Sequence, residues 1–464
     1  MNIKAKVLAL TIMLITFSCP LVPTPDATPI AEGVILQEEN DLPRFNISSV
    51  PFTDLEDNHI GDTFPLDRNP SPCPQVSTDW PFAHVSDLGL KWVRLSLDSI
   101  ELEQARNWDN YSEFEINKCQ EEAIKYLAEN GVTILHVLVY WDRNLHADRY
   151  PNYRITQDKE QFLQYAYMIA KYFRGDIEYY EILNEAYFFV EVEDYIQLIR
   201  EVIPLIHNAD PDAKIVVGGT TNLMYADQQA YLYEVIQSDI IQLVDGIALH
   251  PMYGSSPEYE DIRDYYYDYP NLIQEIKNTA FANGFTGDFF TEEMNWRTAI
   301  NQNIYEPWEY SPAVAAKYYA RGIATNLGLG LWAGIGGENY ETIPQVATVI
   351  QNLSTIMADF KPTDINVKIY SEAENIVHYT FSNDNGDSLL VIWVDGAAVD
   401  DDPGVHASLL FSDLQIDEGI GFDIFEDFGQ ELVTEEADGN LTIEDLLIKD
   451  YPIVIKLVGV DAGY

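Results

Sequence analysis

The sequence predicts an α/β protein in which a (β/α)8 TIM barrel is followed by a C-terminal antiparallel β-sandwich domain. From about residue 85 to residue 345, short β-rich apolar runs alternate with longer segments whose apolar residues recur at helical spacing, which is typical of parallel βαβ units. No GxGxxG or GxxxxGK(S/T) motif follows any of these runs, which disfavours an open nucleotide-binding sheet. From about residue 362 the runs become short and alternating, with turn-forming residues between them, which favours the sandwich.

The strands of the predicted barrel can be located from their composition. Seven are expected at Lys91–Leu97, Thr133–Tyr140, Glu178–Leu183, Lys214–Gly219, Gly246–His250, Asp288–Glu293 and Leu329–Ile335, and an eighth near Arg44–Val50. Amphipathic segments such as Lys118–Asn130 and Lys159–Phe173 supply the helices between them. In a barrel of this kind the reactive side chains lie at the C-terminal ends of the strands and in the loops beyond.

The two predicted domains meet near residue 361. The barrel is expected over residues 41–361 and the β-sandwich over residues 362–464, where Asn383–Gly386 and Asp401–Gly404 provide turn signals. No linker rich in Gly or Ser precedes the sandwich, so we expect it to pack on the barrel.

The N-terminal residues have the layout of a secretory signal. Residues 1–19 contain two lysines followed by the apolar run Val7–Phe17, which is too short to span about 30 Å of hydrocarbon, and residues 20–40 form a linker rich in Pro and Thr. The segment Thr16–Cys19 resembles a bacterial lipoprotein processing site. We therefore expect a secreted or cell-surface protein, and lipidation of Cys19 and plain secretion both stay open.

Charge and cysteine content exclude several classes of partner and site. The chain has 26 Lys and Arg against 76 Asp and Glu, a formal net charge of −50, which would repel nucleic acid and anionic membranes, so membrane contact is expected only through an N-terminal lipid. If Cys19 is lipidated or removed, Cys73 and Cys119 remain as a pair that could form a disulfide. No CxxC motif or His/Cys cluster is present, so no metal site is expected.

Two glutamates are the central candidates for chemistry. Glu185 ends the fourth expected strand, in the segment YYEILNE, and Glu293 ends the seventh, in FFTEEMNW. Either carboxylate alone is explained as readily by a surface or capping position. Strands four and seven face each other across the mouth of a barrel, however, so both carboxylates can reach one bound sugar.

The segments Ile182–Glu185 (ILNE) and Thr291–Trp296 (TEEMNW) resemble the acid/base and nucleophile motifs of glycoside hydrolase clan A, and the surrounding sequence resembles families 39 and 5 of that clan. The resemblance covers most of the chain. It implies a retaining glycoside hydrolase without a cofactor, in which Glu185 is the general acid/base and Glu293 the nucleophile, acting on an oligo- or polysaccharide that is β-linked. The pKa of Glu185 is then expected to be raised and that of Glu293 lowered.

The same resemblance implies roles for four further residues. Arg94, in the segment DLGLKWVRLSL, would keep the nucleophile ionised, and Asn184 would bind the sugar 2-hydroxyl. His250 would orient the sugar or the nucleophile, and Tyr253 could donate a hydrogen bond to the nucleophile. Tyr253 follows His250 at a longer spacing than is common in the clan.

The adjacent acids Glu292 and Glu293 create an ambiguity, because neighbouring residues of a strand point to opposite faces and only one is expected to face the sugar. Glu293 is favoured by its downstream pattern, and Glu292 is the fallback. Trp296 is expected to bind substrate, and Trp332 either floors a sugar subsite or belongs to the barrel core. Tyr140 and Trp141, which end the third strand, are further candidates for lining a subsite.

A different class of function is a carbohydrate-binding surface protein that keeps the barrel without turnover. The presence of both carboxylates counts against it. A cell-surface structural lipoprotein is a third alternative, which would leave the residues at the strand ends unexplained.

Overall fold

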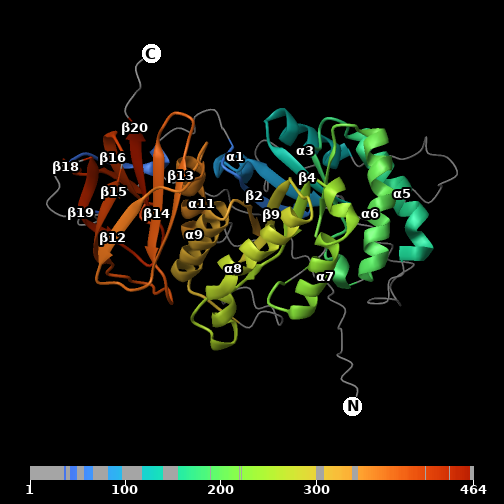
Figure 1. The fold of residues 1–464 in the computed structure, drawn as a ribbon. Helices are drawn as coiled ribbons and strands as arrows, with labels where there is room; N and C mark the ends of the chain where they lie inside the picture. Colours follow the sequence, from blue (N-terminus) through green and yellow to red (C-terminus); the bar gives the residue numbers. More distant parts are fainter. Residues whose placement is uncertain are drawn as a thin grey trace.

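The protein consists of a barrel and a sandwich that lie side by side (Figure 1). The computed structural model describes residues 36–37, 42–49, 57–65, 82–96, 118–138, 155–188, 190–218, 220, 222–298, 308–336, 343–412, 414–437 and 439–459. The expected signal segment, Cys19, Cys73, Tyr140 and Trp141 lie outside these residues, as does the side chain of Cys119. Among the helices of the described part, none combines the length and apolar composition needed to cross a bilayer.

Eight parallel strands close into the expected barrel. They are β2 (Ile60–Pro65), β3 (Trp92–Ser96), β4 (Thr133–Leu138), β5 (Tyr179–Ile182), β6 (Lys214–Val217), β7 (Gly246–Leu249), β9 (Asp288–Asn295) and β10 (Trp332–Gly336). The ring closes because β10 pairs with both β9 and β2, and the two-residue strand β8 (Met252–Tyr253) adds to the outer part of β9. The barrel predicted from the alternation of strands and helices is confirmed.

Helices surround the barrel. They are α1 (Phe82–Asp87), α3 (Lys118–Glu129), α5 (Ile155–Tyr172), α6 (Val192–Ala209), α7 (Ala226–Ile236), α8 (Glu260–Ala282), α9 (Pro312–Gly328) and α11 (Pro344–Ile356). Single 3-10 turns occur at η1 (Ile47–Ser49), η3 (Ala186–Phe188) and η4 (Asp239–Leu243). In α6 the buried residues Tyr195, Leu198, Ile199 and Val202 follow the helical period, so one stripe faces the barrel.

The lower part of the barrel interior is a packed apolar core. Alternate strand residues point inward, and Trp92, Leu135, Tyr179 and Phe290 form part of one buried cluster inside the ring. Among the described residues, these side chains fill the interior below the C-terminal ends of the strands.

The C-terminal domain is the expected β-sandwich. One sheet has the order β1-β17-β16-β20-β14-β13-β11 and the other β12-β15-β19-β18. The strands are β1 (Arg44–Asn46), β11 (Lys361–Pro362), β12 (Val367–Ser371), β13 (Ile376–Ser382), β14 (Ser388–Val394), β15 (Val405–Ser412), β16 (Ile416–Asp423), β17 (Phe428–Glu431), β18 (Glu435–Ala437), β19 (Asn440–Ile448) and β20 (Ile453–Gly459). Buried side chains such as Leu390, Leu409, Ile443 and Ile455 fill the space between the sheets.

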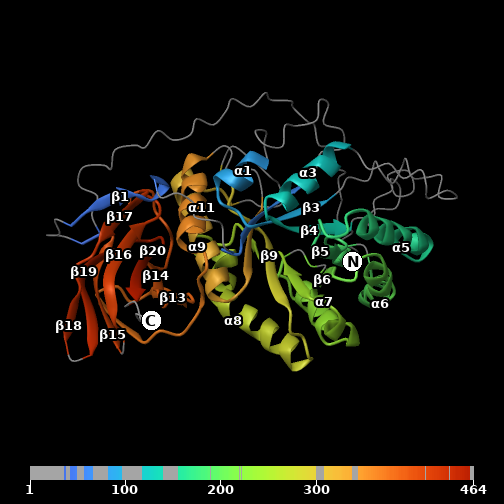
Figure 2. The same ribbon diagram turned by 90° about the horizontal axis from the view of Figure 1, so that it is seen from above.

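The expectation of a barrel strand at Arg44–Val50 is wrong. Strand β1 pairs antiparallel with β17 at the edge of the sandwich, as Figure 2 shows, and the first barrel strand is Ile60–Pro65. Residues 42–49 therefore pack with the second domain although they precede the barrel. Strand β1 is partly exposed at Arg44–Asn46, as expected of an edge strand, whereas IGDTFP carries a glycine and a buried Asp62 that make a buried barrel strand hard to recognise.

Two buried cations on α9 join the barrel to the sandwich, which packs on the barrel as expected. The Arg321 guanidinium donates to the carbonyl oxygens of Asp450 and Gly396 and pairs with Asp395 at 3.2 Å. Lys317 pairs with the Asp450 carboxylate at 2.8 Å. Helix α9 lies between the two domains (Figure 2), which explains why its residues are buried on nearly every side.

Replacing Arg321 with Met is expected to lower the free energy of unfolding by about 3–5 kcal/mol, because Asp395 would lose its buried cation and two carbonyl oxygens would lose the guanidinium as donor. Denaturant unfolding followed by tryptophan fluorescence measures the change. Arg200→Met is the control, since Arg200 makes an exposed pair with Asp239 that is expected to contribute less than about 1 kcal/mol. Equal losses in the two variants would contradict this assignment.

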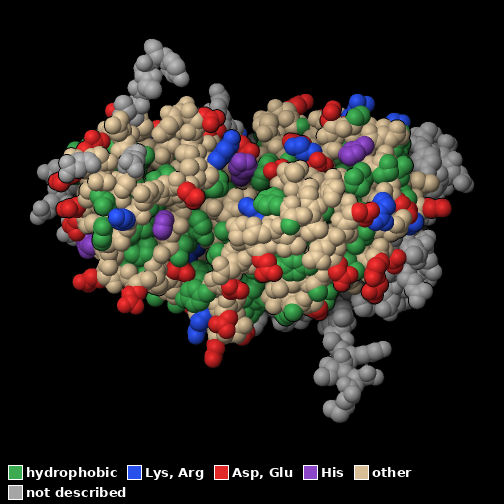
Figure 3. Space-filling model, viewed as in Figure 1, with side chains coloured by type: hydrophobic (Ala, Val, Ile, Leu, Met, Phe, Trp, Pro, Cys, Tyr) green, Lys and Arg blue, Asp and Glu red, His purple; other side chains and the backbone are tan. Residues whose placement is uncertain are grey.

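Acidic side chains are spread over both the sandwich and the barrel on the face drawn in Figure 3. They outnumber lysines and arginines on this face, in keeping with the formal net charge of −50. The charge on this face is dispersed, which favours solubility and mutual repulsion between copies of the chain.

Candidate active site

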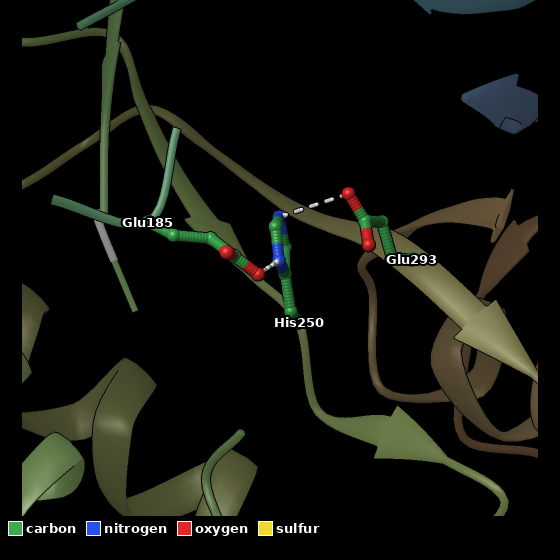
Figure 4. Close-up of side chains that lie close together, drawn as sticks. All are labelled: Glu185, His250 and Glu293. Carbon is green, nitrogen blue, oxygen red and sulfur yellow. Dashed lines mark ion pairs between the residues drawn. The ribbon is translucent and has the colours of Figure 1, made fainter. Parts of the chain in front are cut away.

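Three ionisable side chains converge at the C-terminal end of the barrel. Glu185 follows β5, His250 follows β7 and Glu293 belongs to β9, and Figure 4 shows the imidazole ring between the two carboxylates. The His250 Nδ1 atom lies 3.6 Å from a Glu185 oxygen, and Nε2 lies 3.8 Å from a Glu293 oxygen. One ligand atom from each of the three residues lies within 4.8 Å of the others. Two strands far apart in the sequence therefore present their carboxylates to one small space.

The turn that carries Glu185 has an unusual backbone. Leu183 has a φ of 64° and Glu185 a φ of 49°, so two residues without the freedom of glycine adopt left-handed conformations within three positions. Each such residue costs of order 1–3 kcal/mol. The tertiary structure supports the turn, since the Tyr195 hydroxyl donates to the Ile182 carbonyl at 2.8 Å. This turn directs the Glu185 side chain toward His250.

Arg94, in β3, connects most of the remaining polar groups. Its guanidinium donates to both Glu181 oxygens at 2.7 and 3.0 Å, to Glu293 at 3.0 Å and to the Asn184 side-chain oxygen at 2.6 Å. Its Nε atom also lies 3.0 Å from a Glu292 oxygen. Because Asn184 accepts this bond through oxygen, its NH2 group is the part available to donate to a ligand. The contact between Arg94 and Glu293 stabilises an ionised Glu293.

A β-bulge brings both adjacent glutamates to the same side of β9. Thr291 pairs with Ala333 and Met294 pairs with Ile335, so three steps along β9 match two along β10. Both Glu292 and Glu293 therefore contact Arg94, so strand alternation does not send their side chains to opposite faces. The extra residue interrupts the alternation, so burial and not strand periodicity has to distinguish the two acids.

Two glycines in β10 leave room for this bulge. A Cβ atom at Gly334 would lie 2.4 Å from the Thr291 carbonyl oxygen and 2.8 Å from that of Glu292. A Cβ atom at Gly336 would lie 3.1 Å from the Glu293 Cα. The two glycines of the segment WAGIG thus let the backbone of β9 approach β10 closely at the bulge.

Burial distinguishes the two adjacent acids. The Glu293 side chain is 24% exposed, and that of Glu185 is 26% exposed, whereas Glu292 is 0% exposed. The Glu292 carboxylate accepts from or pairs with His250 Nε2 at 3.1 Å. Glu293 therefore lies where a ligand can reach it, and Glu292 lies beneath it.

Glu181 is a buried acid of this site that the sequence reasoning missed. It is held by Arg94, and burial together with the nearby Glu292 charge raises its pKa to about 8, against the opposing effect of Arg94. Strand alternation in the segment YYEILNE could have identified it, because Tyr179 and Glu181 are two positions apart and share the inward face of the strand. An acid on an inward strand position just below Asn184 and Glu185 is a site candidate by that alternation.

The raised pKa of Glu181 makes the stability of the protein depend on pH. The folded state holds the proton that an unfolded chain, with a pKa near 4.5, releases, so this contribution is complete below about pH 4.5 and is lost as pH rises through about 8. In Glu181→Gln, the difference in Tm from the parent protein is expected to shift in favour of the variant between pH 5 and pH 8.5. Glu178→Gln, at the exposed start of the same segment, is the control. A difference that stays constant with pH would contradict the prediction.

His250 has a strongly perturbed charge equilibrium. Burial alone would lower its pKa, but Glu293, together with hydrogen bonds to Glu185 and Glu292, outweighs burial and raises the pKa to about 10. The ring is therefore an imidazolium at neutral pH, and neither nitrogen has a free lone pair. The three converging side chains are accordingly unsuited to bind a metal ion unless the ring loses a proton.

The structure corrects the expected substrate contact of Trp296 and favours the barrel-core alternative for Trp332. Trp296 is fully buried, its indole NH donates to the Ser255 carbonyl at 2.8 Å, and it packs beside α9, so it cannot touch a sugar from this position. Trp332 begins β10 and packs against His59 and Phe290, at the N-terminal end of the barrel interior. The position of a tryptophan in the sequence does not reveal whether its side chain lies in the core or at the substrate site.

The side chain of Tyr253 is outside the described part of the structure. Its backbone lies in β8 and pairs with Asn295. The expected contact of Tyr253 with the nucleophile thus stays a prediction, as do the roles of Tyr140 and Trp141.

No protein-family model matches the sequence, and no curated protein matches it. The fold is shared with solved glycoside hydrolases. A family 39 enzyme from the gut symbiont Bacteroides cellulosilyticus WH2 is 13% identical with a TM-score of 0.61, over 87% of this chain and 81% of that chain. A family 51 α-L-arabinofuranosidase from Bifidobacterium longum is 12% identical with a TM-score of 0.54, over 90% of this chain and 100% of that chain. The expected resemblance to clan A is thus supported, at the level of the fold.

Proposed function

We propose that the protein is a retaining glycoside hydrolase in which Glu185 is the general acid/base and Glu293 is the nucleophile. The observation that carries the proposal is the convergence of these two partly exposed carboxylates at the C-terminal end of the barrel, where an oxygen of one lies within 4.8 Å of an oxygen of the other. Retaining enzymes hold their two carboxyl groups about 5–5.5 Å apart, whereas inverting enzymes leave a wider gap for water. The shared fold with glycoside hydrolases supports the same conclusion.

The reaction proceeds by double displacement. A Glu293 oxygen attacks the anomeric carbon and forms a glycosyl ester, while the glycosidic oxygen leaves and takes the proton held by Glu185. Glu185 is now a carboxylate and removes a proton from water, whose oxygen attacks the anomeric carbon and releases Glu293. One glycosidic bond and one water molecule are consumed, and both side chains return to their starting forms.

The groups around the pair favour this assignment of roles. Arg94 stabilises the ionised form of Glu293 through a 3.0 Å contact, which a nucleophile requires. Asn184 has its side-chain oxygen bound by Arg94, so its NH2 group can donate to a sugar hydroxyl beside the reacting carbon.

The proposed substrate is an oligo- or polysaccharide with a β-glycosidic bond, as the sequence resemblance implies, and the proposed location is outside the cell or on its surface. The test is a hydrolysis screen on aryl glycosides and on plant and microbial polysaccharides. An active sugar is then converted to its 2-deoxy-2-fluoro derivative with a good leaving group, which should trap a glycosyl ester. We expect mass spectrometry of the peptides to find the label on Glu293.

Two outcomes would contradict the proposal. A label on Glu292 would reassign the nucleophile. Binding of a glycan without release of reducing ends would favour the non-catalytic carbohydrate-binding protein.

A further inference from the structure

The buried Glu292 takes no part in the displacement steps, yet it contacts both cations of the site. One oxygen lies 3.1 Å from His250 Nε2 and 3.0 Å from Arg94 Nε. Its other oxygen is buried and has no hydrogen-bond partner within the described residues. A buried carboxylate with an unsatisfied oxygen is costly, which argues that this side chain serves the site and not the stability of the barrel.

The position of His250 matches the change of charge during double displacement. Before the first step Glu293 is charged and Glu185 carries the proton. In the glycosyl-enzyme Glu293 is a neutral ester and Glu185 is charged. The ring lies at nearly equal distances from the two, 3.6 Å from Glu185 and 3.8 Å from Glu293, so one fixed cation can compensate whichever acid is ionised.

We propose that Glu292 is a positioning residue that keeps His250 an imidazolium through the whole catalytic cycle, so that a single buried cation compensates Glu293 before the first step and Glu185 after it. This inference rests on the proposed function for its catalytic meaning. Glu292 suits the role because it is 0% exposed and forms no bond in the reaction, so it keeps its contact with His250 while the charges of Glu185 and Glu293 alternate.

The other ionisable groups around His250 are consistent with this. Glu185 and Glu181 face it from β5 and the turn beyond, Glu293 and Glu292 face it from β9, and Arg94 opposes its charge from β3. The hydrogen bond to Glu292 is among the interactions that raise the pKa of His250 to about 10. The imidazolium is therefore complete at neutral pH and is lost as pH rises through about 10, and removal of the Glu292 charge shifts that loss to lower pH.

The direct test is an imidazole NMR titration of His250 in the full-length protein, with His250→Gln to assign the signal. The parent protein should show an imidazolium at pH 7.5, and in Glu292→Gln the midpoint should fall by about 1–3 pH units. Glu292→Asp should restore part of the shift, because it keeps the charge. Glu178→Gln, at the opposite end of β5, should leave the titration unchanged.

A second test measures the kinetics of hydrolysis with the substrate found in the glycoside screen. Glu292→Gln should lower kcat by about 100-fold and move the alkaline limit of the kcat profile to lower pH, while KM changes little. A uniform loss at every pH would indicate a merely structural role and overturn the proposal. So would a neutral His250 in the parent protein at pH 7.5, even if Glu292→Gln does not fold. An imidazolium in a protein that hydrolyses no glycoside would instead contradict the proposed function alone.

Discussion

Glu293→Gln is expected to lower kcat by about 10⁴-fold or more, with little change in the affinity for substrate. The amide has nearly the shape of the carboxylate but is not a nucleophile, so the glycosyl ester cannot form. Arg94 would keep its hydrogen bonds to Glu181 and Asn184, so the site should keep its geometry. Steady-state kinetics on the best substrate from the screen measures the loss.

The comparison that decides between the adjacent acids uses two further variants. Glu293→Gly removes the side chain and should regain activity with azide, which attacks the same carbon and yields a glycosyl azide of inverted configuration. Glu292→Gln should not respond to azide, because the buried Glu292 is not in contact with the anomeric carbon. Azide rescue at position 292 in place of position 293 would overturn the assignment.

Glu185→Gln is expected to have the second largest effect, and its size should depend on the leaving group. For a poor leaving group, which needs protonation to depart, kcat/KM should fall by about 10²–10⁴-fold. For a dinitrophenyl leaving group the first step should be nearly unaffected, because the departing phenolate needs no proton. The second step should still be slow, since Glu185 also activates water, so the glycosyl-enzyme should accumulate as a burst.

The burst and its response to azide are the measurements that identify Glu185 as the acid/base. Azide needs no general base, so it should speed release of the glycosyl group and yield a product of retained configuration. A loss of kcat/KM that is the same for every leaving group would indicate that Glu185 only binds substrate. Glu178→Gln, near the start of β5, is the matched control for removal of a carboxylate from this segment.

Much of the fold could be predicted because its signals are local. Seven barrel strands were located from apolar runs of strand length, and the sandwich from its short alternating runs. The first barrel strand was missed because IGDTFP is not a continuous apolar segment. Arg44–Asn46 was misplaced because a strand of three residues does not reveal which sheet it joins. Which sheet an edge strand joins is decided by pairing partners far away in the sequence, here residues 428–430.

The residues of the site at or near strand ends could be predicted from the sequence, whereas the buried Glu181 and the packing of two tryptophans were not predicted. Arg94, Asn184, Glu185, His250 and Glu293 were named from their positions at or near strand ends, and the structure brings them together. Glu181 was overlooked, Trp296 was assigned to the substrate although it is buried, and Trp332 could not be separated from the barrel core to which it belongs. Aromatic residues serve cores and sugar sites equally well, so composition cannot separate the two uses.

The sequence by itself determined seven of the eight barrel strands, the large negative charge and the pair of strand ends that carry Glu185 and Glu293. The tertiary structure alone decided that both Glu292 and Glu293 face Arg94, because the bulge depends on the space that Gly334 and Gly336 leave in the neighbouring strand. It also decided which of the two acids is buried. Periodicity and chain order are properties of a segment, whereas register, burial and the charge held by a buried group are set by whatever packs against it.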